Sequence, residues 1–98
     1  MKEIKYTDEF ITWLEGLKDA TERVRLKRRI DKYGRGIKGD VEPVGEGVSE
    51  MREHFGAGYR MYFIERGGAL VVMLGGGTKS KQQKDIEKAK RLARRIKG

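Results

Sequence analysis

The chain has 98 residues with no cysteine, one histidine, and 23 Lys and Arg residues against 15 Asp and Glu residues, for a formal net charge of +8. This length predicts one domain, and the composition excludes disulfides, thiolate nucleophiles and cysteine-based zinc sites and argues against a histidine-rich metal centre. The positive charge favours polyanionic partners such as nucleic acid, the ribosome or an acidic protein segment, with an anionic membrane surface as the alternative.

The first third of the chain is predicted to hold one short strand and two helices. Residues 3–7 alternate weakly, which favours a strand. The helix that follows has Thr7 as its N-cap and an apolar stripe at helical spacing. The stripe consists of Phe10, Trp13, Leu14 and Leu17. A second helix is predicted from the capping residue Asp19 to Tyr33, with Gly34 ending it. The short connection predicts an antiparallel helical hairpin.

The middle of the chain predicts an antiparallel meander of three or four strands. Its segments are residues 40–44, 47–55, 58–65 and 69–74, separated by glycine-containing turns. Pro43 restricts the first of them to an edge or a strand end. The last segment, from Ser80 onward, predicts an amphipathic helix with a basic outer face. The fold class is therefore α+β, in a single domain over residues 1–98.

The stretch "LGGGTKS", residues 74–80, has the composition of a phosphate-binding loop. A Walker loop requires glycine directly before the lysine, and here Thr78 precedes Lys79. A nucleotide triphosphatase is therefore excluded. The alternative is a flexible corner between strand and helix, in which Ser80 and Gln83 form a capping box.

Strand periodicity predicts a cluster of polar side chains on one sheet face. A hairpin turning around Gly56 sets Arg52 across from Arg60. Glu50, His54 and Tyr62 share that face by alternation. Two arginines in this position either hold an anion between them or lie solvated on an open face. His54 is the one side chain whose ordinary pKa lies near neutrality, although a lone histidine at a strand end is usually a surface residue.

The segment "GVSEMREHFGAGYRMYFIERGGALVVMLGGGTKSKQQKDIEKAKRLA" resembles the addiction-module killer proteins, a HigB-like branch of the RelE/ParE superfamily of toxins from type II toxin–antitoxin systems. The resemblance covers nearly the whole chain. It implies a two-helix hairpin packed on a small antiparallel sheet, with a C-terminal helix. It also implies ribosome-dependent cleavage of mRNA without metal or cofactor, in which the 2′-hydroxyl attacks the adjacent phosphate.

The resemblance assigns the residues of this site. Arg60 matches the phosphate-stabilising arginine of the superfamily, and Arg52 matches the basic residue of the preceding strand. Lys79 lies where many relatives place a His, Arg or Lys after the last strand. This chain lacks the histidine or tyrosine of the best-studied nucleases there. The general acid and base therefore stay open among four candidates, in falling order of preference Lys79, Glu50, Tyr62 and His54.

The basic helices are the predicted contacts with ribosomal RNA or mRNA. These residues are Arg28, Arg29, Lys81, Lys84, Lys88 and Arg91. The implied partners are a cognate antitoxin, the ribosome and mRNA, with no small-molecule cofactor. No apolar run approaches the roughly 20 residues of a spanning helix and no signal peptide is visible, so we expect a cytoplasmic protein without membrane contact. A toxin that inhibits DNA gyrase, or a basic RNA-binding module, are the alternatives.

Overall fold

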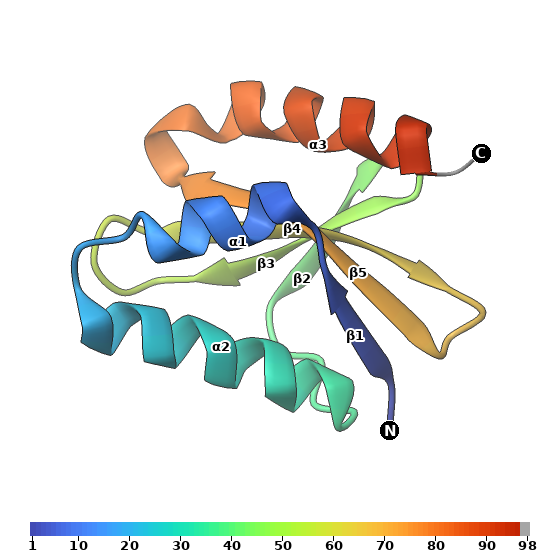
Figure 1. Cartoon of the computed structure of the whole chain (residues 1–98), viewed down its shortest axis with the longest axis horizontal. Helices are drawn as coiled ribbons and strands as arrows, with labels where there is room; N and C mark the ends of the chain where they lie inside the picture. Colours follow the sequence, from blue (N-terminus) through green and yellow to red (C-terminus); the bar gives the residue numbers. More distant parts are fainter. Residues whose placement is uncertain (97–98) are drawn as a thin grey trace.

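In the computed structural model, which describes residues 1–96, a five-stranded sheet lies between two helical layers (Figure 1). The elements are β1 (Glu3–Tyr6), α1 (Asp8–Glu15), α2 (Ala20–Gly34), β2 (Val41–Gly45), β3 (Val48–Glu53), β4 (Tyr59–Arg66), β5 (Leu70–Thr78), a 3₁₀ turn (Lys79–Lys81) and α3 (Gln82–Ile96). None of the described helices is long and apolar enough to cross a membrane. Lys97 and Gly98, which belong to the predicted domain, lie outside the described residues.

The sheet has the order β1-β5-β4-β3-β2, which confirms the α+β class and corrects the number of strands. β2 to β5 form the predicted antiparallel meander, and Pro43 lies on the edge strand β2 as expected. The fifth strand is β1, which pairs in parallel with β5 over Leu70–Met73. This pairing joins the N-terminal strand to the last strand of the meander, and no local sequence pattern predicts it.

One face of the sheet carries the predicted helical hairpin. α1 and α2 run in opposite directions across it (Figure 1). Thr7 accepts a hydrogen bond from the Phe10 amide, and Asp19 accepts from Thr21 and Glu22, so both predicted N-caps are confirmed. The core of this layer contains Phe10, Leu14, Leu26, Ile30, Met51, Met61, Phe63 and Met73.

The other face of the sheet is covered by α3, so the prediction of an open face is wrong. Ala89, Leu92 and Ala93 of α3 are buried against β-strand side chains of the alternate parity. The strand side chains of this second core are Val48, Tyr62, Ile64, Val72 and Leu74. Since β4 lies in the centre of the sheet, its residues Tyr59–Ile64 are all buried. Of the polar cluster predicted from periodicity, Glu50, Arg60 and Tyr62 therefore lie beneath a helix rather than in solvent.

The glycine run also differs from the prediction, because Gly75–Gly77 belong to β5 and pair with β4. A Cβ atom at Gly76 would lie 2.5 Å from the Trp13 ring, and one at Gly77 would overlap the Asp85 carboxylate. The missing side chains thus let α1 and α3 approach the strand from both faces. Ser80 does not cap α3, since it lies within the 3₁₀ turn and its hydroxyl pairs with that of Thr78.

Replacing Gly76 with alanine should destabilise the fold, because the added methyl group forces the Trp13 ring to move. We expect the free energy of unfolding to fall by about 1–3 kcal/mol, the usual effect of overpacking. Urea denaturation followed by the fluorescence of the single tryptophan measures this change. Gly75→Ala is the matched control, because nothing lies within 4 Å of its added Cβ. Equal stability of the two variants would contradict the packing of Trp13 on β5.

Candidate functional site

Arg52 of β3 and Arg60 of β4 are directly opposed in the antiparallel ladder, as periodicity predicts. Glu50 faces Tyr62 two pairs further along, on the same side of the sheet. The side chain of Arg52 is 34% exposed, whereas Arg60 is 6% exposed and Glu50 and Tyr62 are fully buried. The cluster is therefore open to solvent at Arg52 and closed by α3 on its inner side.

The Glu50 carboxylate organises this cluster. Gln82, the first residue of α3, donates its side-chain amide to both carboxylate oxygens, at 2.8 and 2.9 Å. Arg52 Nε lies 3.5 Å and Arg60 Nε 3.8 Å from Glu50 Oε1. The longer of these is an ion pair without a hydrogen bond. The Glu50 carboxylate thus lies between two guanidinium groups.

Several buried polar atoms of the cluster have no hydrogen-bond partner among the described residues. These atoms are Arg60 Nε and Nη1, the Tyr62 hydroxyl and Asp85 Oδ2. Buried donors and acceptors are normally satisfied, because leaving them unpaired carries a desolvation penalty. The unpaired N–H groups of Arg60 can therefore donate to an anion, and the Tyr62 hydroxyl can act with them.

Tyr62 can serve this cluster as a donor but not as a base. Burial raises the pKa of its hydroxyl far above the ordinary value. The neighbouring carboxylates of Glu50 and Asp85 raise the pKa further, and Arg60 lowers it. The phenol consequently stays protonated at neutral pH.

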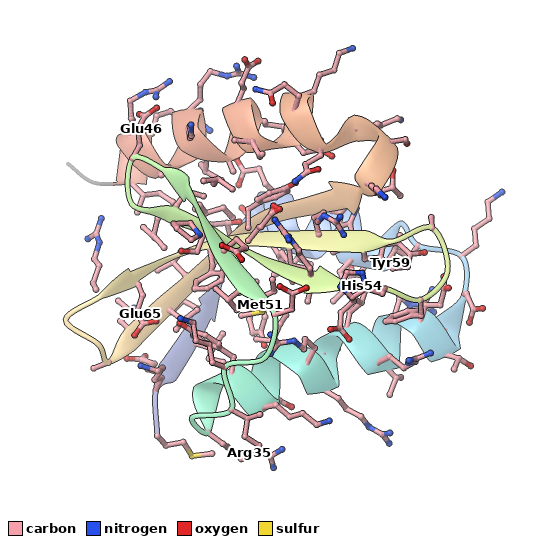
Figure 2. The ribbon with its side chains drawn as sticks, turned by 180° about the vertical axis from the view of Figure 1, so that it is seen from behind. Arg35, Glu46, Met51, His54, Tyr59 and Glu65 are labelled. Carbon is pink, nitrogen blue, oxygen red and sulfur yellow. The ribbon has the colours of Figure 1, made fainter. Side chains whose placement is uncertain are left out.

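The other two acid–base candidates lie around the cluster rather than within it. Lys79 is exposed in the 3₁₀ turn, and its backbone N–H donates to the Gly58 carbonyl at 2.8 Å, which holds this turn on the β3–β4 hairpin. The His54 ring is 70% exposed and its Nε2 lies 2.9 Å from Asp40 Oδ2. This hydrogen bond is the main reason why the pKa of Asp40 is lowered. Figure 2 shows His54 at the opposite end of β3 from Glu46.

Of the predicted nucleic-acid contacts, five lie on the surface and one does not. The exposed residues are Arg28, Lys81, Lys84, Lys88 and Arg91. Arg29 is 7% exposed, lies 3.3 Å from Glu53 and donates to the Lys38 carbonyl. Its prediction as a phosphate contact is wrong, because its charge is already used to join α2 to β3 and to the loop before β2.

The sequence did not identify Gln82 or Asp85 as members of the site. Gln82 meets Glu50 across 32 residues of chain, and Asp85 meets Gly77 only because β5 continues through the glycine run. Neither contact leaves a local signal in the sequence. Residues 1–96 contain no group of three or more His, Cys, Asp or Glu side chains that could hold a metal ion.

Comparison with known proteins finds a sequence relative and similar solved structures. No protein-family model matches the chain. An uncharacterized protein of Haemophilus influenzae is 40% identical over 94 residues, which cover 96% of this chain and 95% of that protein. A mutant of the E. coli toxin RelE in the free state, with two arginines changed to alanine, aligns with a TM-score of 0.68 at 15% identity, over 92% of this chain and 96% of that chain. A chain in the intact E. coli RelBE toxin–antitoxin complex aligns with a TM-score of 0.64 at 12% identity, over 80% and 96%.

Two tyrosines on β4 provide a test of the unpaired buried groups. Tyr59→Phe removes a 2.6 Å hydrogen bond to Glu22 and should lower the free energy of unfolding by about 0.5–1.5 kcal/mol. Tyr62→Phe removes a hydroxyl without a partner in the described residues, so stability should stay equal or rise. Chemical denaturation of both variants measures the difference. A larger loss for Tyr62→Phe than for Tyr59→Phe would show that the Tyr62 hydroxyl is already satisfied.

Asp85 should make stability fall as pH rises. Burial raises the pKa of its carboxyl, an effect that Lys88 and Lys81 oppose. Because the folded pKa exceeds the unfolded one, the charged form is disfavoured in the fold, and the loss of stability begins above the usual aspartate pKa of about 3.9. Asp85→Asn should therefore raise the melting temperature at neutral pH and leave it unchanged at a pH below that value. Thermal unfolding across the acid range measures this, and a gain that does not depend on pH would contradict it.

Proposed function

Because the chain belongs to one family with the uncharacterized Haemophilus influenzae protein and has the fold of the E. coli toxin RelE, we propose that it is the toxin of a type II toxin–antitoxin system. Its proposed activity is the ribosome-dependent cleavage of mRNA in the cytoplasm. Its proposed partners are a cognate antitoxin, the ribosome and mRNA. The similar structures are a toxin and a toxin–antitoxin complex, and the same kind of partner is proposed here by analogy.

The observation that carries this proposal is the convergence of Arg52 and Arg60 on Glu50. Cleavage by the 2′-hydroxyl without a metal needs a base at that hydroxyl, an acid at the departing 5′-oxygen and cations around the phosphorus. In the proposed site, the buried carboxylate is the base, and the two guanidinium groups are the cations around the phosphorus. The unpaired N–H groups of Arg60 are donors for the non-bridging oxygens.

In the proposed reaction Glu50 takes the proton of the 2′-hydroxyl as its oxygen attacks the adjacent phosphorus. The bond from phosphorus to the 5′-oxygen breaks, and Lys79 gives a proton to that oxygen. The products are a cyclic phosphate and a free 5′-hydroxyl. Arg52 and Arg60 stabilise the charge on the phosphorane-like transition state, and Tyr62 contributes a hydrogen bond. His54 has no step in this scheme, since it pairs with Asp40.

Access to Glu50 requires a movement of the start of α3. Glu50 is fully buried and Gln82 occupies both of its oxygens, so RNA reaches the carboxylate only when Gln82 withdraws. We assign this movement of α3 to the docking of the exposed cations on ribosomal RNA. Those cations are Arg28, Lys81, Lys84, Lys88 and Arg91.

The burial of Glu50 and Arg60 also favours a second candidate function. A toxin whose polar cluster stays closed would act by binding alone, as in the inhibition of DNA gyrase. The two functions differ in their products, because only the nuclease creates new RNA ends.

Charge-conserving arginine variants test the proposed site. Arg60→Lys and Arg52→Lys should each reduce mRNA cleavage on programmed ribosomes by about 100-fold or more, because lysine cannot replace the planar fork of donors around the phosphate. Primer extension measures the cleavage, and addition of EDTA to already assembled complexes should not remove it. Arg35→Lys, an exposed arginine at the end of α2, is the control.

The outcomes separate the candidates. Growth arrest with supercoiling defects and no new 5′ ends would replace the nuclease with the gyrase inhibitor. Induction without any effect on growth would leave a basic RNA-binding module. The Arg52 side chain is partly exposed, so Arg52→Lys spares the core. Full cleavage by this variant would show that the proposed site does not take part in the reaction.

A further inference from the structure

β5 has an unpaired edge over its second half. β1 pairs with β5 only as far as Met73, where Thr7 closes the junction by donating its backbone N–H and its hydroxyl to the Met73 carbonyl at 3.2 and 2.8 Å. The chain then turns into α1. Among residues 1–96, Gly75–Thr78 have β4 on one side and no strand on the other. Such an edge is a template for a further strand.

A cavity of about 590 Å³ lies along this edge, between α1 and α3. Its inner lining consists of the apolar side chains of Trp13, Leu74, Ala89 and Leu92, the backbone of Gly75 and Gly76, and the partly buried carboxylate of Asp85. This lining is mainly apolar, and a Cβ at Gly75 would meet no atom within 4 Å. The cavity can therefore take a large apolar side chain from a segment that pairs with the β5 backbone.

The rim of the cavity is basic. Lys88 and Arg91 of α3 line it, and neither makes an ion pair with another described residue. Arg95 meets Glu9 of α1 at 3.4 Å across the opening, where both side chains are largely exposed. An exposed pair of this kind contributes little to stability and can open. Acidic side chains would complement this rim.

We propose that this groove binds an extended segment of the antitoxin, which adds as a strand to the free edge of β5, fills the cavity with an apolar side chain and pairs its acidic side chains with Lys88 and Arg91. The identification of the segment as part of the antitoxin rests on the proposed function. The groove itself does not depend on that function. RNA is the less suitable occupant, because it would use the cations but leave the apolar lining and the strand edge without partners. Since Lys88 and Arg91 are also proposed RNA contacts, the bound segment would compete with ribosomal RNA.

A short synthetic peptide of alternating Glu and Leu residues is the probe. Its binding to the full chain is measured by fluorescence anisotropy, with a single-stranded RNA of matched charge in parallel. Gly75→Leu fills the cavity, and Lys88→Glu reverses the charge of the rim. Each should weaken peptide binding by about tenfold or more, a loss of about 1.4 kcal/mol. Lys90→Glu is the matched control, because it makes the same charge change on the same helix while the Lys90 amine lies beside Gly45, away from the groove.

Hydrogen exchange of residues 74–78 supplies the second readout, since an added strand protects backbone amides on this edge. Peptide binding that Gly75→Leu and Lys90→Glu affect equally would overturn the proposal, as would RNA binding with the same sensitivity to Gly75→Leu. Peptide binding by a chain whose induction does not arrest growth would support the proposed groove and contradict the proposed toxin function. Growth arrest without peptide binding would support the toxin function and contradict the groove. A cognate antitoxin that neutralises Gly75→Leu as well as the unaltered chain would have the same meaning.

Discussion

The close approach of two helical layers to β5 is the constraint on which the site depends. Trp13 of α1 lies against Gly76 and Asp85 of α3 against Gly77, on opposite faces of one strand. Any side chain at either glycine would push a helix away from the sheet. Because α3 lies this close to the sheet, its first residue, Gln82, reaches the Glu50 carboxylate. The glycine run thus fixes the depth at which the polar cluster is covered.

Burial beneath α3 makes this cluster chemically unlike a surface patch of arginines. An exposed ion pair between Glu50 and Arg52 or Arg60 would contribute little, since water screens it. Under α3 the same charges interact in a medium of lower dielectric constant, and Arg60 Nε and Nη1 have no hydrogen-bond partner among the described residues. In the proposed reaction, a phosphate oxygen would supply the missing acceptor.

Local patterns predicted the parts of this arrangement that depend on sequence neighbours. The alternation of residues in β3 and β4 set Arg52 across from Arg60, and the Thr7 and Asp19 caps set the starts of both hairpin helices. The patterns missed what depends on distant contacts. The parallel pairing of β1, the burial of Arg29 by Glu53 and the Gln82–Glu50 contact each join segments far apart in the chain. The glycine run was misread because glycine normally ends strands, and only the helices on either side explain its place within one.

The groove beside β5 and the cluster beneath α3 share one element, and this links the two proposals. Lys88 and Arg91 of α3 line the groove, whereas Gln82 at the start of α3 covers Glu50. Contacts with these cations that stabilise α3 in its present position also keep Gln82 on the carboxylate, because the helix moves as a hydrogen-bonded unit. A strand seated on β5 against α3 would therefore favour the closed cluster, while ribosomal RNA that draws the same cations outward would favour the open one. On this basis, neutralisation needs no contact with Arg52 or Arg60, since the two partners differ in the position of α3 that they stabilise.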